Sequence, residues 1–61
     1  MKTIVYIAPK GGNYRITASG TCPDNHDSVS AIGRKPEEDE IIGMGVDEAD
    51  AWEEAITTAT L

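Results

Sequence analysis

The sequence predicts a small α+β fold, in which an antiparallel sheet of three or four strands carries one C-terminal helix packed across it. Two segments near the start are rich in β-branched and aromatic residues and are separated by a proline-glycine turn. The last fifteen residues have the apolar spacing and the capping residue of an amphipathic helix. A chain of 61 residues has room for one thin core, so residues 1–61 are expected to form a single domain.

The two N-terminal segments are predicted to form a β-hairpin. Residues 3–8 (TIVYIA) end at residues 9–12 (PKGG), a turn signal. Residues 14–18 (YRITA) then alternate apolar and polar side chains, the period of a half-buried strand. Apolar residues occupy both faces of the first strand, so it is expected to be the central strand, covered on both sides.

The middle of the chain gives weaker signals. Residues 19–28 (SGTCPDNHDS) are dominated by turn-forming residues and predict a loop. Residues 29–34 (VSAIGR) are read as a third strand of low propensity, followed by an acidic connection that begins at Pro36. Residues 41–46 (IIGMGV) predict a short fourth strand or an irregular extended segment, whose two glycines suggest a bulge or a close approach of another backbone.

The clearest local signal predicts a helix over residues 48–60. Asp47 is a favourable N-cap, and acidic residues crowd the first turns near the positive end of the helix dipole. Small and apolar residues recur along one face: Ala51, Trp52, Ala55, Ile56 and Ala59. The alanines are expected to let the helix lie close to the sheet, with Trp52 supplying most of the core volume.

Charge is strongly segregated along the chain, whose net charge is −6. Residues 1–35 hold all five basic residues, whereas residues 36–61 hold nine acidic residues and no basic one. A field of this sign repels phosphate backbones and attracts basic surfaces, so direct nucleic-acid binding is disfavoured and a basic protein partner is favoured. No apolar run approaches the length of a membrane span, and a single cysteine argues against a secreted disulfide scaffold, so a cytoplasmic location is expected.

The segment from Cys22 to Asp27 is a candidate metal or catalytic site because it brings a thiol, an imidazole and two carboxylates together. A structural zinc site needs four ligands, and a thiol nucleophile needs an oriented base and an oxyanion pocket, so either site would be incomplete here. Neither Gly11-Gly12 nor Gly43-Met44-Gly45 completes a phosphate-binding loop. We therefore expect a non-enzymatic protein without metal or cofactor; a small enzyme or metal protein centred on Cys22 and His26 is the less favoured alternative.

The predicted partner-binding residues are the carboxylates of the acidic connection and of the helix. They are Glu37, Glu38, Asp39, Glu40, Asp47, Glu48, Glu53 and Glu54. If the alanine face of the helix packs inward, these residues are expected to form one continuous negative surface. Such a surface can mimic nucleic acid and dock on a basic groove, as an inhibitor or antagonist would, and in size and charge the chain resembles phage anti-CRISPR proteins. The alternative is that the acidic run serves only solubility.

The order of hairpin, further strand and capped helix resembles the HicB-type antitoxin domain. Gly45, Asp47, Asp50 and Ala51 match in kind the glycine, the cap and the helix start of that family. Gly12 and Tyr14 match its glycine-aromatic hairpin. The resemblance covers about half of the chain; the Pro-x-x-Pro-Gly segment of the family is absent, and no separate DNA-binding domain follows.

The resemblance implies a sheet-plus-helix module that covers a basic RNA-cleaving toxin. A related alternative is an oligomeric structural module, such as a homodimer, held together by strand edges rather than by charge.

Overall fold

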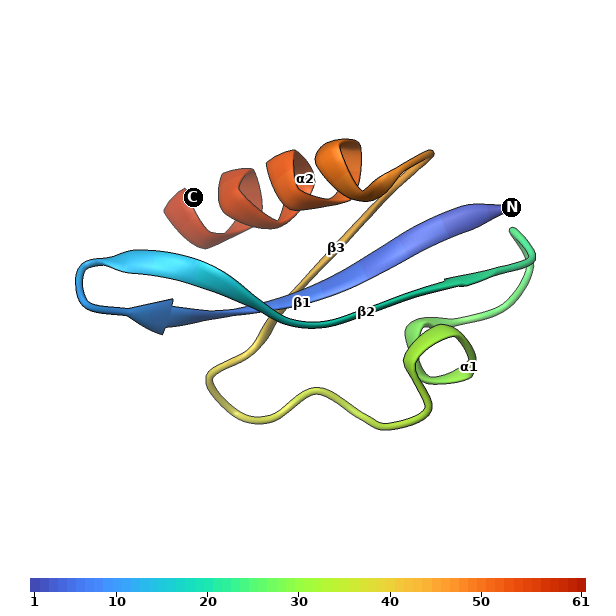
Figure 1. The fold of residues 1–61 in the computed structure, drawn as a ribbon, viewed down its shortest axis with the longest axis horizontal. Helices are drawn as coiled ribbons and strands as arrows, with labels where there is room; N and C mark the ends of the chain where they lie inside the picture. Colours follow the sequence, from blue (N-terminus) through green and yellow to red (C-terminus); the bar gives the residue numbers. More distant parts are fainter.

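The computed structural model describes residues 1–61 as a three-stranded antiparallel sheet with two helices (Figure 1). The elements are, in order, β1 (Lys2–Lys10), β2 (Asn13–Cys22), α1 (Ser28–Ile32), β3 (Ile41–Gly45) and α2 (Glu48–Thr60). The strand order is β2-β1-β3, so the first strand is central, as predicted. The α+β class and the C-terminal helix are confirmed.

The hairpin between β1 and β2 turns on two residues, Gly11 and Gly12. Their φ angles of 56° and 86° are both positive, which a two-residue turn of type I′ requires and glycine adopts at low cost. Lys10 and Asn13 close the turn. Pairing then continues to Lys2 and Cys22, so residues 19–22 belong to β2 and the predicted loop begins later than expected.

A bulge interrupts β2 at Thr17. Tyr6 pairs with Ala18, but the next β1 residue, Ile7, pairs with Ile16, which leaves Thr17 as the extra residue. Ile16 therefore packs with the cluster around Ile7, whereas Ala18 packs with the cluster around Tyr6. The predicted alternation, which placed Ala18 on the same face as Ile16, is wrong because the bulge reverses the faces.

The predicted strand over residues 29–34 is also wrong, because this segment forms the short helix α1. The Asp27 carboxylate accepts a hydrogen bond from Ser30 N at 3.0 Å and caps the helix. Gly33 ends it with a φ of 92°, and its N–H donates to Val29 O at 2.7 Å. The two caps favour a helix, and the weak strand propensity of the segment does not overcome them.

Helix α2 lies against β3 at the two glycines of that strand. A Cβ on Gly43 would lie 2.6 Å from Ala55 Cβ and would also meet the carbonyl oxygen of Ala51. The predicted close approach is therefore confirmed. Asp47 caps the helix as expected, accepting from Asp50 N at 2.9 Å.

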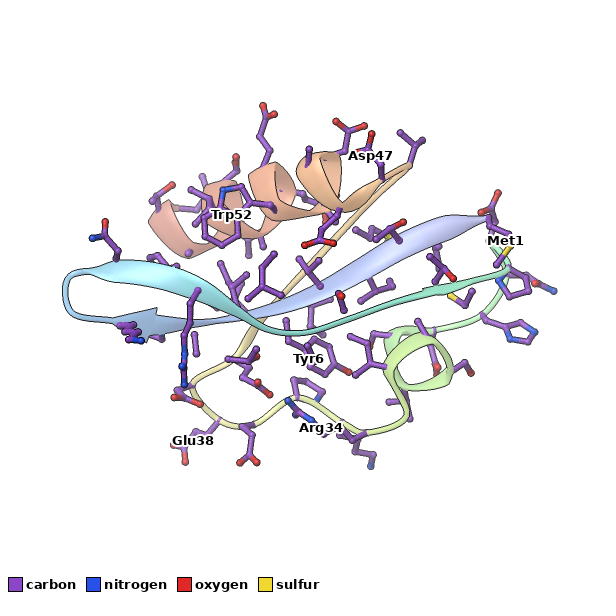
Figure 2. The ribbon with its side chains drawn as sticks, in the orientation of Figure 1. Met1, Tyr6, Arg34, Glu38, Asp47 and Trp52 are labelled. Atoms are coloured by element: carbon purple, nitrogen blue, oxygen red, sulfur yellow. The ribbon has the colours of Figure 1, made fainter.

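Each face of the sheet is covered by a different helix. Val5 and Ile7 pack against the fully buried Ala51 and Ala55 of α2. The other face holds Ile4, Tyr6 and Cys22, and Ala31 and Ile32 of α1 pack against them. The largest fully buried side chains all come from β1: Tyr6, Ile4, Ile7 and Val5. Trp52, expected to supply most of the core, is only half-buried at its margin (Figure 2).

Candidate interaction surface

The sheet divides the predicted acidic surface into two patches. Helix α2 covers the face of Val5 and Ile7, whereas the loop that follows α1 crosses the opposite face, where Tyr6 Oη donates to Arg34 O at 2.8 Å. Figure 2 shows Asp47 and Glu38 on opposite sides of the sheet. The expected continuous surface is therefore replaced by a patch on α2 and a patch on the loop.

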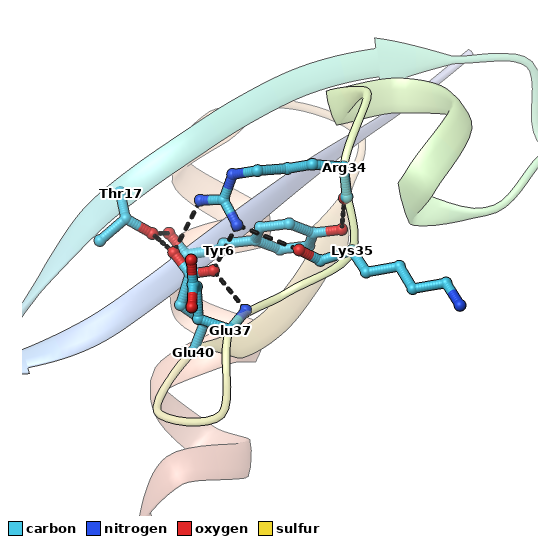
Figure 3. Close-up of polar contacts among 6 residues, drawn as sticks. All are labelled: Tyr6, Thr17, Arg34, Lys35, Glu37 and Glu40. Atoms are coloured by element: carbon cyan, nitrogen blue, oxygen red, sulfur yellow. Dashed lines mark hydrogen bonds and ion pairs between the residues drawn. The ribbon is translucent and has the colours of Figure 1, made fainter.

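Glu40 is turned inward and does not belong to either patch. Its Oε1 accepts from Arg34 Nη1 at 2.6 Å and from Glu37 N at 2.7 Å, and its Oε2 accepts from Arg34 Nη2 at 2.9 Å (Figure 3). Thr17 Oγ1 also donates to Oε2. The hydrogen bonds from Arg34, Glu37 N and Thr17 lower the pKa of Glu40 to about 2. The Glu40 side chain is only 3% exposed, so it stabilises the fold and is not available to a partner.

We call this arrangement the Glu40 clasp: Tyr6, Thr17, Arg34 and Glu40. The guanidinium of Arg34 lies 5.2 Å from the centre of the Tyr6 ring, within the range of a cation–π contact. The bulge in β2 directs Thr17 to the same side of the sheet, where its hydroxyl reaches Glu40. The sequence offered no direct signal for the clasp, because its members are distant in the chain and meet only through strand pairing.

The loop patch retains three exposed carboxylates, those of Glu37, Glu38 and Asp39. They lie in the same loop as two exposed cations, of which Arg34 is paired with Glu40 and Lys35 has no such partner. Opposite charges so close together reduce the net field that a distant partner would meet. The loop is therefore less suited to attract a basic surface than the sequence suggested.

The α2 acidic face consists of five exposed carboxylates without a neighbouring base in the helix. They are Asp47, Glu48, Asp50, Glu53 and Glu54. Asp50 lies three and four residues before Glu53 and Glu54, a spacing that places the three on one side of the helix. Asp50 therefore belongs to the candidate site, although the sequence pattern assigned it only to the start of the helix.

An open groove runs beside the α2 acidic face. Its lining combines carboxylates with exposed apolar side chains: Met44, Gly45, Val46, Asp50, Glu53, Glu54 and Thr57. Met44 is 42% exposed and Val46 is 77% exposed. Glu54 also reaches the strand, where its Oε1 accepts from Met44 N at 3.2 Å. The groove therefore offers a negative rim and a small apolar contact to a partner.

The segment from Cys22 to His26 has a structural arrangement. Cys22 is buried, and its Sγ faces the main-chain oxygens of His26 and Asp27 at 3.9 and 3.8 Å. The His26 side chain is exposed. No three histidine, cysteine or acidic side chains are grouped so that they could hold a metal ion.

Neither helix has the length and apolar character needed to cross a bilayer.

Comparison of the chain with protein-family models, with curated proteins and with solved structures found no match. Its function is therefore inferred from its own surface.

Proposed function

We propose that this protein is a non-enzymatic inhibitor or antagonist that binds a basic, nucleic-acid-binding surface of another protein through the α2 acidic face. The observation that carries the proposal is the gathering of five exposed carboxylates on one helix and its cap, with no basic residue in α2 or β3. Long-range attraction to a basic surface raises the rate of encounter and selects for partners of that charge.

The carboxylates of the α2 acidic face are distributed along a helix that packs on the sheet. Asp47 and Glu54 are seven residues apart, which corresponds to roughly 10 Å along a helix axis. The carboxylates between them project from a rigid element, held to the sheet by the buried Ala51 and Ala55. Charges on a helix that is held in place lose less freedom on binding than the same charges on a segment that must first be ordered.

The loop patch is the weaker candidate for the same role. Glu40 and Arg34 are committed to the clasp, and Lys35 offsets part of the charge of the remaining carboxylates. This difference provides a matched pair of variants. Glu48→Gln with Glu53→Gln removes two charges from the α2 acidic face, whereas Glu37→Gln with Glu38→Gln removes two from the loop patch. All four side chains are exposed.

Affinity capture from cells of the native host tests the proposal with three baits: the wild-type protein, the α2 variant and the loop variant. We expect the wild type and the loop variant to retain a basic nucleic-acid-binding protein, and the α2 variant to lose it. Added duplex DNA or RNA should displace the retained protein. Equal retention by all three baits, or retention unaffected by nucleic acid, would contradict the proposal.

A second candidate is a HicB-like antitoxin or an oligomeric structural module. The hairpin, β3 and the Asp47-capped α2 follow one another in the order that this resemblance implies. The unpaired outer edge of β2 favours the oligomeric form, because a strand edge offers main-chain groups to another strand. A dimer that forms at low and high salt while the α2 variant still retains the captured partner would favour this candidate over the first.

A further inference from the structure

The two edges of the sheet differ in length and in protection. β3 forms one edge with only five residues, and the Glu54 carboxylate already occupies the N–H of Met44 there. β2 forms the other edge with ten residues, and Arg15 is its only charged residue. Short strands and charged side chains are the usual means by which proteins block an edge. The β3 edge is therefore guarded, whereas β2 has neither form of protection; α1 packs against one face of β2 at Gly20, where a Cβ would meet Ala31 O.

The pairing pattern shows which main-chain groups of β2 point outward. The Met44 N–H points away from β1 and toward Glu54. Ile4, the β1 residue opposite Met44, therefore directs its own N–H and C=O groups to the other side, toward β2. Its partner on β2 is Gly20, whose main-chain groups point inward to β1. Because the direction alternates along a strand, Ser19 and Thr21 turn their N–H and C=O groups to the outer side. Both residues are exposed.

We propose that two copies of this chain pair through their outer β2 edges, antiparallel, with Ser19 of one copy opposite the partner's Thr21. This register places a two-fold axis at Gly20 and repeats the same pair on both sides of it. Each pair exchanges two main-chain hydrogen bonds, so the two pairs form four. The sheets join into one of six strands, in the isologous arrangement common to homodimers.

The neighbouring residues favour this register over its alternatives. If Ser19 of one copy paired with Ser19 of the other, Thr21 would lie opposite the bulged Thr17, where the ladder is disrupted. If Thr21 of one copy paired with Thr21 of the other, Ser19 would lie opposite Pro23, which has no N–H to donate. The register that pairs Ser19 with Thr21 places Thr17 opposite Pro23, so both the bulge and the proline fall outside the two hydrogen-bonded pairs.

A second copy suits this edge better than an unrelated strand for two reasons. First, β2 carries no carboxylate, and the α2 acidic face lies beside the opposite edge, so pairing through β2 keeps the most negative surfaces of the two copies apart. Second, the chain buries only nine residues, and its single cysteine cannot form an internal disulfide. A core of this size provides little stability, and pairing with a second copy would increase it.

Sedimentation analysis of purified protein tests the pairing. We expect the wild type to be a dimer at low and high salt, and Thr21→Pro to be a folded monomer, because proline removes an outward N–H that no β1 group uses. Thr21→Val keeps the N–H and should remain dimeric. A monomeric wild type at its highest soluble concentration, or a dimeric Thr21→Pro variant, would overturn the proposal.

Cross-linking tests the register without relying on proline. In a Cys22→Ser background, Ser19→Cys and Thr21→Cys proteins are oxidised separately and as a mixture. Residues in a hydrogen-bonded antiparallel pair have Cα atoms about 5.5 Å apart, within disulfide reach. We expect a covalent dimer only in the mixture; dimers from either protein alone, or none in the mixture, would overturn the register. Glu48→Gln with Glu53→Gln should stay dimeric, which separates this inference from the function proposed for the α2 acidic face.

Discussion

Arg34 and Glu40 form a two-pronged ion pair across the loop between α1 and β3, with Nη1–Oε1 and Nη2–Oε2 distances of 2.6 and 2.9 Å. The two partners differ in environment, because the Glu40 side chain is 3% exposed and that of Arg34 is 42% exposed. The buried carboxylate fastens the loop to β2 through Thr17, and the exposed guanidinium covers the Tyr6 ring. This pair therefore determines how the loop lies on the sheet.

Acid should destabilise the protein through Glu40. Its pKa is about 2 in the folded chain and 4.5 in its ordinary state, so the folded form holds the carboxylate ionised more strongly than the unfolded form does. The resulting stability is fully present above about pH 4.5 and is lost as the pH falls toward 2. Denaturant unfolding between pH 6 and 2 should show the free energy of unfolding declining across this window.

Comparison with Glu40→Gln assigns the decline to this carboxylate. The variant should be less stable than the wild type at pH 6, and the difference should shrink toward pH 2. Glu38→Gln, which alters an exposed loop residue, should follow the wild-type curve. A constant difference between wild type and Glu40→Gln at every pH would contradict the assignment.

Removal of the Tyr6 hydroxyl should loosen the loop while leaving the core filled. Tyr6→Phe loses the hydrogen bond to Arg34 O, and we expect the free energy of unfolding to fall by about 0.5–1.5 kcal/mol. Amide hydrogen exchange should also become faster at Glu40, whose N–H donates to Glu37 O. Tyr14→Phe is the control, because Tyr14 lies at the core margin and its hydroxyl makes no hydrogen bond within the chain. Equal effects of the two changes would contradict the role given to the Tyr6 hydroxyl.

A methyl group at Gly43 should push α2 away from β3. Gly43→Ala places a Cβ against Ala51 and Ala55, and overpacking of this kind costs about 1–3 kcal/mol. Met44→Ala, at the next and exposed position, should cost less than about 1 kcal/mol. Thermal unfolding followed by circular dichroism measures both. A Gly43→Ala variant as stable as the wild type would show that α2 does not pack as closely as described.

The hairpin turn should accept asparagine at its first position. Gly11 has a φ of 56°, in the left-handed region that asparagine tolerates, and Asn-Gly is a preferred sequence for a type I′ turn. Gly11→Asn should raise the free energy of unfolding by about 0.4–1 kcal/mol, because the unfolded chain loses freedom. Gly11→Val should lower it, since a β-branched residue is strained at positive φ. Chemical denaturation of both variants checks the sign of each change.

The parts of the fold that the sequence predicted are those with local causes. The hairpin follows from Gly11-Gly12, and α2 follows from the Asp47 cap and from alanines at helical spacing. Helix α1 also has local causes, the Asp27 cap and Gly33, but its short length and its valine and isoleucine made it resemble a strand. A search for capping residues on both sides of the segment would have identified it.

The parts that the sequence did not predict depend on contacts between distant residues. The bulge at Thr17 depends on how β2 meets β1, and no local pattern marks it. Glu40 resembles its acidic neighbours in the sequence, and only its meeting with Arg34 and Thr17 sets it apart. The observed candidate surface therefore differs from the predicted one: it excludes Glu40 and includes Asp50, and the sheet separates the carboxylates of α2 from those of the loop.

The most direct measurement for the proposed function is the dissociation constant of the captured partner for the wild type, the α2 variant (Glu48→Gln with Glu53→Gln) and the loop variant (Glu37→Gln with Glu38→Gln). Each pair of changes removes the same charge from exposed side chains on opposite sides of the sheet. We expect the α2 variant to bind several-fold to about tenfold more weakly, with a reduced dependence on salt, and the loop variant to bind as the wild type does. Equal weakening in both variants, or in neither, would contradict binding through the α2 acidic face.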